Sequence, residues 1–180
     1  MHLAKAGILG GAALLMIGAA LPVAPASQHS RHQPLVDKIN EVASFEINAE
    51  VCWENPGIMG AYNYFENSLY ICNPKAETLA DLNEEDLDTI RHEAIHLAQD
   101  CVSGGIGSKT TALFFSDRKV EEMVEEAEEK GLIDADGIVR SYQMIGASDD
   151  DIEHELEAWS GAALLSAGQV VEIVDLACSR

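Results

Sequence analysis

Residues 83–105 of the 180-residue chain read NEEDLDTIRHEAIHLAQDCVSGG, and we expect them to form the helix on which the rest of the fold is built. Asn83 is a good helix N-cap, and the three acidic residues after it favour the positive end of the helix dipole. The glycine pair at 104–105 should end the helix. Apolar residues recur at helical spacing and form one stripe, which consists of Leu87, Ile90, Ala94, Ile95, Ala98, Cys101 and Val102. This stripe should pack into the core.

The other side of this helix carries His92, His96 and Gln99, and residues 92–96 have the pattern HExxH. Histidines four residues apart lie one turn apart on a helix, so both rings can bind one metal ion, and zinc suits such ligands. Glu93 could then accept the proton of a water molecule that the zinc ion activates. Gln99 could orient a metal ligand, or it could merely cover the helix face. The pattern predicts a zinc site at His92 and His96 with Glu93 as general base.

The third zinc ligand has to come from another part of the chain. A catalytic zinc ion usually has three protein ligands and one open position for water, and HExxH supplies two of them. The extended pattern HExxHxxGxxH is absent, because Asp100, Cys101 and Val102 follow Gln99. Residues 153–159 read EHELEAW and offer four alternative ligands, which are Glu153, His154, Glu155 and Glu157.

HExxH followed by ExxA on a later helix resembles the gluzincin metallopeptidases, and residues 155–158 (ELEA) supply the second motif. In that family the first Glu of ExxA is the third zinc ligand, so the resemblance implies this role for Glu155. Ala158 would let the two helices approach each other. The chain is also similar to small, disulfide-bearing secreted or phage-type proteins with HExxHxxQ, seen here at residues 92–99. The resemblance implies a zincin-like fold and peptide-bond hydrolysis. Further candidates for stabilising an oxyanion are Tyr62, Tyr64, Tyr142 and His154.

The remaining segments predict an α+β domain in which a small antiparallel sheet packs on the metal helix and on further helices. Alternating apolar residues predict a strand at 46–53, and two more strands are expected at 58–65 and 68–72. Helices besides the central one are expected at 34–44, 117–130, 149–167 and 169–177. Residues 110–115 could be helix or strand, and residues 134–137 should form a turn.

The N-terminal region has the features of a secretory signal peptide. A short apolar segment ends in Ala24-Pro25-Ala26, which fits the A-x-A cleavage pattern. We therefore expect residues 1–26 to be the signal, residues 27–33 a linker and residues 34–180 one zincin-like domain; an uncleaved N-terminal anchor is the alternative. The mature protein should be secreted or periplasmic, with no stable membrane association after cleavage.

The four cysteines, at positions 52, 72, 101 and 178, are an even number in a small exported domain and so predict two disulfides. Three pairings are possible. We prefer Cys52–Cys72 with Cys101–Cys178, because the first pair flanks the expected hairpin region and the second joins the end of the metal helix to the C-terminus.

The formal net charge of −20 argues against binding to nucleic acid or to anionic membranes. It is compatible with a cationic substrate, and equally with simple solubility outside the cell. We expect a monomeric, secreted zinc endopeptidase that acts on peptides or proteins. The alternatives are an exported, non-catalytic zinc-binding or interaction domain stapled by disulfides, and a zinc amidase acting on a non-protein amide.

Overall fold

The computed structural model describes residues 27–104 and 112–179. The expected signal peptide at 1–26 lies outside the described residues, as do residues 110–111 of the ambiguous segment. The elements follow in the order α1 (Gln28–Val42), β1 (Ser44–Ile47), α2 (Glu50–Glu54), β2 (Gly60–Asn63), β3 (Ser68–Ile71), the 3-10 helix η1 (Leu79–Asp81), α3 (Glu84–Val102), α4 (Asp117–Glu129), α5 (Ala135–Met144), α6 (Asp149–Leu164) and α7 (Ala167–Cys178).

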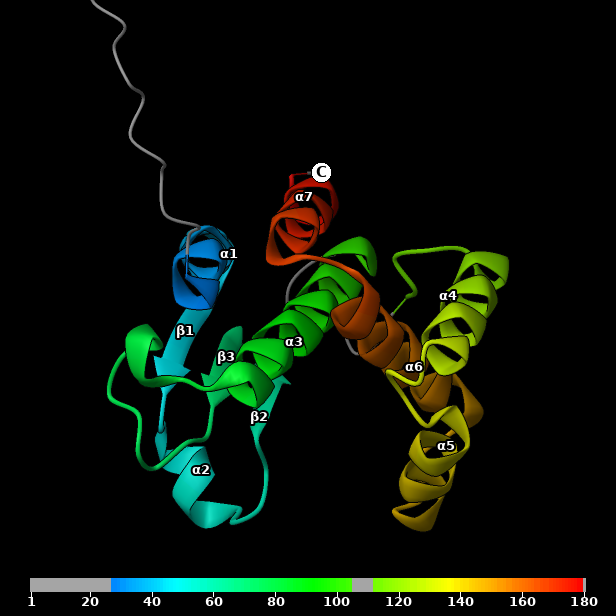
Figure 1. Ribbon diagram of the computed structural model, residues 1–180, viewed down its shortest axis with the longest axis horizontal. Helices are drawn as coiled ribbons and strands as arrows, with labels where there is room; N and C mark the ends of the chain where they lie inside the picture. Colours follow the sequence, from blue (N-terminus) through cyan, green and yellow to red (C-terminus); the bar gives the residue numbers. More distant parts are fainter. Residues whose placement is uncertain (1–26, 105–111, 180) are drawn as a thin grey trace, which may run out of the picture.

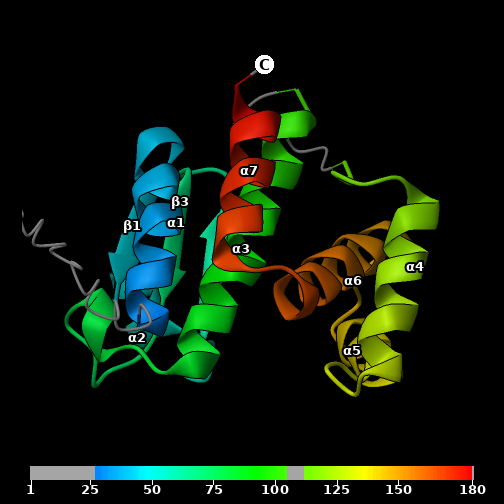
Figure 2. The same ribbon diagram turned by 45° about the horizontal axis from the view of Figure 1, so that its top comes forward.

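Helix α3 occupies the centre of the molecule (Figure 1). The sheet and α1 lie on one side of it, α7 runs along it, and α4, α5 and α6 lie on the other side (Figure 2). The expected N-cap is confirmed, because the side-chain oxygen of Asn83 accepts hydrogen bonds from the backbone N–H groups of Glu85 and Asp86. Most of the predicted apolar stripe is buried: Ile90, Ala94 and Ile95 are fully inaccessible to solvent, whereas Cys101 and Val102 at its end are partly buried.

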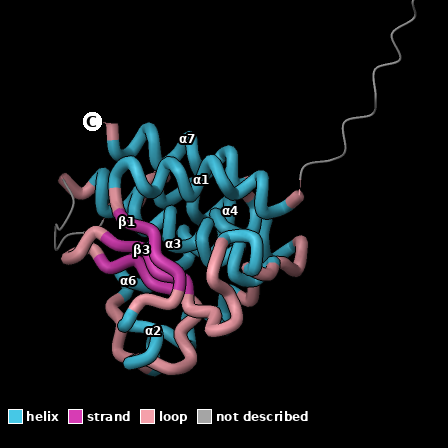
Figure 3. Tube along the Cα trace, turned by 90° about the vertical axis from the view of Figure 1, so that its left-hand side faces the viewer, coloured by secondary structure: helices cyan, strands magenta, loops and turns pink. Residues whose placement is uncertain are grey.

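The sheet is mixed rather than antiparallel, so the α+β class is confirmed and the expected sheet type is wrong. The three strands lie side by side in one sheet (Figure 3). Their order is β1-β3-β2, with β1 parallel and β2 antiparallel to β3. All four residues of β3 (Ser68–Ile71) are buried. A strand that is buried along its whole length fits the centre of a sheet, and β1 therefore pairs with β3 instead of with β2.

The strand expected at 46–53 ends at Ile47, because Asn48 adopts a left-handed conformation with φ of 59°. The Asn48 side chain donates hydrogen bonds to the backbone oxygens of Asn73 and Ala76, which holds this bend. The following residues form α2 and direct Cys52 inward. The alternation of apolar residues in this stretch was a misleading signal.

Three further boundaries differ from expectation. Helix α1 begins at Gln28, so residues 28–33 are helical and not a linker. Asp134, where a turn was expected, is the N-cap of α5 and accepts a hydrogen bond from the backbone N–H of Gly137. The helix expected at 149–167 ends at Leu164, and the helix expected at 169–177 begins at Ala167, because Ser166 is the N-cap of α7. The described residues 112–115 are irregular.

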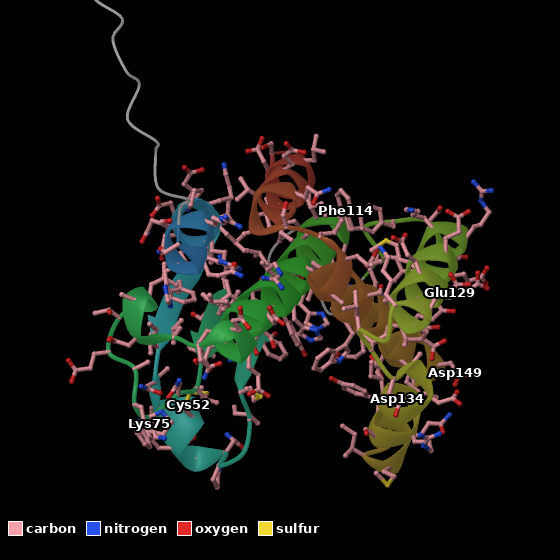
Figure 4. All side chains as sticks on the ribbon, in the orientation of Figure 1. Cys52, Lys75, Phe114, Glu129, Asp134 and Asp149 are labelled. Carbon is pink, nitrogen blue, oxygen red and sulfur yellow. A yellow bond between two sulfur atoms is a disulfide. The ribbon has the colours of Figure 1, made fainter. Side chains whose placement is uncertain are left out.

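Both preferred disulfides are confirmed. Cys52–Cys72 joins α2 to the residue after β3, and Cys52 is labelled in Figure 4. Cys101–Cys178 joins the C-terminal ends of α3 and α7. The second disulfide spans 77 residues of sequence, so it greatly restricts the unfolded chain. None of the described helices is long and apolar enough to cross a membrane.

Helix α6 packs closely against α3 because small residues face the contact. Ala158 and Gly161 of α6 are buried, and a Cβ atom added at Gly161 would lie only 2.4 Å from Cδ1 of Ile95. Ile95 is fully buried, so its side chain has little space in which to move. A glycine at position 161 therefore sets the distance between the two helices.

We predict that Gly161→Ala lowers the free energy of unfolding by about 1–3 kcal/mol, although alanine is the better helix former. The matched control is Gly168→Ala in α7, where the nearest atom to an added Cβ is the Ser166 hydroxyl at 4.0 Å. That change should leave the free energy of unfolding unchanged or raise it by up to about 1 kcal/mol. Urea denaturation measures both. Adding Ile95→Val removes the Cδ1 atom and should restore part of the loss; a Gly161→Ala protein as stable as wild type would contradict the packing argument.

Candidate metal centre

Three side chains from α3 and α6 bring one metal-ligating atom each to the same place. The Nε2 atoms of His92 and His96 are 3.1 Å apart, and Oε2 of Glu155 lies 3.4 Å from the first and 3.5 Å from the second. Tetrahedral coordination at about 2.0–2.1 Å separates neighbouring ligand atoms by roughly 3.3–3.4 Å. The group therefore has the spacing of a first coordination sphere and could hold a metal ion.

The other candidates for a third ligand point elsewhere. Glu153 is exposed, and Nδ1 of His154 lies 2.5 Å from the backbone oxygen of Asp150. The carboxylate of Glu157 is fully buried and accepts hydrogen bonds from Gln99 and from the backbone of the segment before α4. Only Glu155 of these four residues joins the two histidines.

Gln99 fixes the orientation of His96. Its Oε1 atom lies 2.7 Å from Nδ1 of His96, so Nδ1 carries the hydrogen and donates it. In the neutral ring, the Nε2 atom of His96 then has its lone pair on the side that faces His92 and Glu155. A histidine that binds a metal ion through Nε2 needs an acceptor for the hydrogen on Nδ1. Gln99 provides this acceptor and is fully buried.

The three side chains interact strongly even without a metal ion. Burial opposes a positive charge on His96, but the hydrogen bond and negative charge of Glu155 outweigh it and raise the pKa of His96 to about 9. Burial also opposes ionisation of Glu155, but its hydrogen bonds with His92 and His96 outweigh this and hold its pKa well below the usual range. The site thus favours a positive charge beside Glu155, which a proton or a metal cation can supply.

Two aromatic residues border the three side chains. The Tyr142 hydroxyl, from α5, donates a 2.7 Å hydrogen bond to Oε2 of Glu155. Burial and the charge of Glu155 raise the pKa of Tyr142 above its ordinary value, so the hydroxyl keeps its proton. The Trp159 ring packs on His92 with ring centroids 4.7 Å apart. Sequence reasoning missed Trp159, although its spacing of four from Glu155 places both on one face of α6.

The site lies in a cleft between β2 and the helices α5 and α6. Two adjoining cavities of about 470 Å³ and 290 Å³ share Gly60, His92, Glu93 and Tyr142 in their walls. Gly60 is required here because β2 approaches α3 closely: an added Cβ would lie 2.6 Å from Cγ2 of Thr89 and 2.7 Å from the backbone oxygen of Tyr70. The cleft leaves the ligand atoms open to molecules from outside.

One edge of β2 has no strand beside it among the described residues. The backbone N–H of Cys72 donates to the Met59 oxygen, and Met59 lies directly opposite Cys72 in the register of the pair. Hydrogen-bonded and non-hydrogen-bonded residue pairs alternate along two antiparallel strands. The N–H and C=O groups of Gly60 and Tyr62 therefore point away from β3. Gly60 and Tyr62 both line the cavity beside the histidines.

Comparison of the chain with protein-family models, with curated proteins and with solved structures gives no match. What can be concluded about the site therefore comes from the geometry of its own residues.

We predict that Glu155→Ala lowers the affinity for Zn²⁺ by at least about tenfold, since it removes one of the three ligand atoms that converge among the described residues. Glu153→Ala is the matched control, because it removes an exposed carboxylate from the same helix. Calorimetric titration of Zn²⁺ into each metal-free protein measures both affinities. Wild-type affinity in the Glu155→Ala protein would show that this carboxylate is no ligand.

Proposed function

We propose that this protein is an exported zinc-dependent endopeptidase of the gluzincin type. The observation that carries the proposal is the convergence of His92, His96 and Glu155 in an open cleft, with Glu93 beside them. A structural zinc site is usually closed by four protein ligands, whereas a catalytic site keeps one position open. Three ligands in an accessible cleft therefore favour the peptidase over a domain that uses zinc only for stability.

The residues around the proposed ion have separate tasks. A zinc ion held by the three ligands would acidify a water molecule and polarise the carbonyl of the scissile bond. Glu93 is largely buried, and its Oε1 lies 4.0 Å from Nε2 of His92, so it is placed to take the proton of that water. The same carboxyl group can then pass the proton to the leaving amine. Tyr142 can donate its hydroxyl hydrogen to the carbonyl oxygen as negative charge develops there.

The open edge of β2 is a suitable place for an extended peptide. The free backbone groups of Gly60 and Tyr62 can form hydrogen bonds with a substrate backbone in the manner of an added strand. Such a peptide would run along the cleft past the three ligands. This arrangement supports a peptide substrate more than a small non-protein amide, which has no backbone to pair along the edge.

The cleft also carries a charge preference. Its walls include the carboxylates of Glu85 and Asp88 in one cavity, and none of the described residues in either wall is Lys or Arg. Asp88 is partly balanced by Arg91, which lies 2.5 Å away just outside. Together with the net charge of −20, this favours neutral or basic peptides. The two disulfides favour an oxidising location such as the cell exterior or the periplasm.

Glu93→Gln should keep wild-type affinity for Zn²⁺ and lower kcat by about 10²–10⁴-fold, since it removes the general base and leaves all three ligands in place. Calorimetric Zn²⁺ titration and cleavage of a broad peptide library measure the two quantities separately. Unchanged turnover in the variant would overturn the mechanism, and a wild-type protein that binds Zn²⁺ but cleaves no peptide would overturn the proposed function.

Peptides with Lys near the cleavage point should be cut with a kcat/KM about tenfold above that of otherwise identical peptides with Glu, and added salt should reduce the difference. Glu85→Gln should lower the ratio of kcat/KM for the Lys peptide to kcat/KM for the Glu peptide. Glu125→Gln, the same charge change on α4 away from both cavities, should leave it unaltered. Equal rates for the two peptides at low salt would exclude the preference.

A further inference from the structure

Glu157 is a fully buried carboxylate that the proposed mechanism does not use. Its Oε2 accepts hydrogen bonds from Nε2 of Gln99 at 2.7 Å and from the backbone N–H of Phe114 at 3.1 Å, and its Oε1 accepts one from the backbone N–H of Phe115 at 2.7 Å. All three donors are neutral amides. Burying a carboxylate among neutral groups is costly, so its presence here calls for a reason beyond packing.

The partners of Gln99 leave its amide only one orientation. Its Nε2 atom donates both to Glu157 and to the backbone oxygen of His154, at 2.7 Å and 3.0 Å. Turning the amide over would set Oε1 against these two oxygen atoms. The Oε1 atom must therefore face His96, where it accepts the hydrogen on Nδ1.

His92 is held in a different way. Its Nδ1 atom is buried and has no hydrogen-bond partner among the described residues, and its ring packs on Trp159. His96 is thus the histidine whose hydrogen-bonding state is set by neighbouring polar groups, through Gln99.

We propose that Glu157 is a positioning residue of the metal centre: it orients the Gln99 amide, which in turn keeps the hydrogen of His96 on Nδ1 and the lone pair of Nε2 directed at the metal. The inference rests on the metal site of the proposed function. Helix α6 then supplies two carboxylates with different tasks, Glu155 to bind the ion and Glu157 to prepare one of its other ligands. Glu157 also ties the site to the segment that leads into α4, where Phe114 lies close to α6 (Figure 4).

The test compares Zn²⁺ affinity in Glu157→Gln, in Gln99→Leu and in the double variant. Glu157→Gln keeps the shape but replaces one acceptor oxygen by an NH₂ group, so either Phe115 alone or Gln99 together with Phe114 loses its acceptor. In either orientation the negative charge that strengthens these hydrogen bonds is gone, so the Gln99 amide is held less firmly. We expect each single variant to bind Zn²⁺ at least about tenfold more weakly. Because Glu157 acts through Gln99, the double variant should bind no more weakly than Gln99→Leu alone.

Ser160→Ala is the control, since Ser160 is equally buried on α6 and bonds to the backbone oxygen of Glu157 but does not touch Gln99. It should keep the wild-type Zn²⁺ affinity within about twofold. Thermal unfolding of the metal-free proteins reports any general loss of structure. Wild-type affinity in Glu157→Gln, or additive losses in the double variant, would overturn the inference.

NMR of the zinc-loaded wild-type protein tests the same inference without a mutation. The His96 ring should show a hydrogen on Nδ1 that exchanges slowly with solvent, and in Glu157→Gln this exchange should be faster. A His96 ring that carries its hydrogen on Nε2 would overturn the proposal. Failure of wild type to bind Zn²⁺ would overturn both this inference and the proposed function, whereas Zn²⁺ binding without hydrolysis would remove the proposed function alone.

Discussion

The close contact between α6 and α3 is the constraint on which the site depends. The histidines lie on α3 and Glu155 lies on α6, so the three ligand atoms meet only if the two helices approach closely. Gly161 makes that approach possible, because a side chain at this position would meet Ile95. A weakly packed pair of helices would leave only two ligands in place. The fold and the candidate chemistry thus depend on the same few buried atoms.

Much of this could be predicted from the sequence because the signals are local. The N-cap at Asn83, the apolar stripe of α3 and the spacing of His92 and His96 all follow from helix periodicity, and the structure agrees with each. The placement of Glu155 beside the histidines was expected from a family resemblance, since nothing in the helix pattern separates it from Glu153 or Glu157. The helix pattern also gives no sign that the carboxylate of Glu157 is fully buried.

The structural predictions that were wrong failed because of contacts between residues far apart in the sequence. The strand expected at 46–53 had the correct alternation, but hydrogen bonds from Asn48 to a loop more than 20 residues away turn the chain there. The parallel pairing of β1 with β3 depends on which strand occupies the centre of the sheet, and a strand's own sequence does not state its neighbours. The role of Glu157 depends on Gln99 and on a backbone segment before α4, so no pattern within α6 reveals it.

The molecule has two halves: one contains the sheet, α1, α3 and α7, and the other contains α4, α5 and α6. Both disulfides lie among the sheet region, α3 and α7, and α4, α5 and α6 contain no cysteine. Apart from the chain connections at its two ends, the half that carries Glu155 and Tyr142 is therefore attached to α3 by non-covalent contacts, which include the hydrogen bond between Glu157 and Gln99. A metal ion bound by both halves would add its binding free energy to this contact, because it binds the assembled site and not the separated helices. Opening of the cleft and loss of such an ion would then be linked equilibria, so an ion that supports the proposed hydrolysis would also help to hold together the walls between which a peptide would bind.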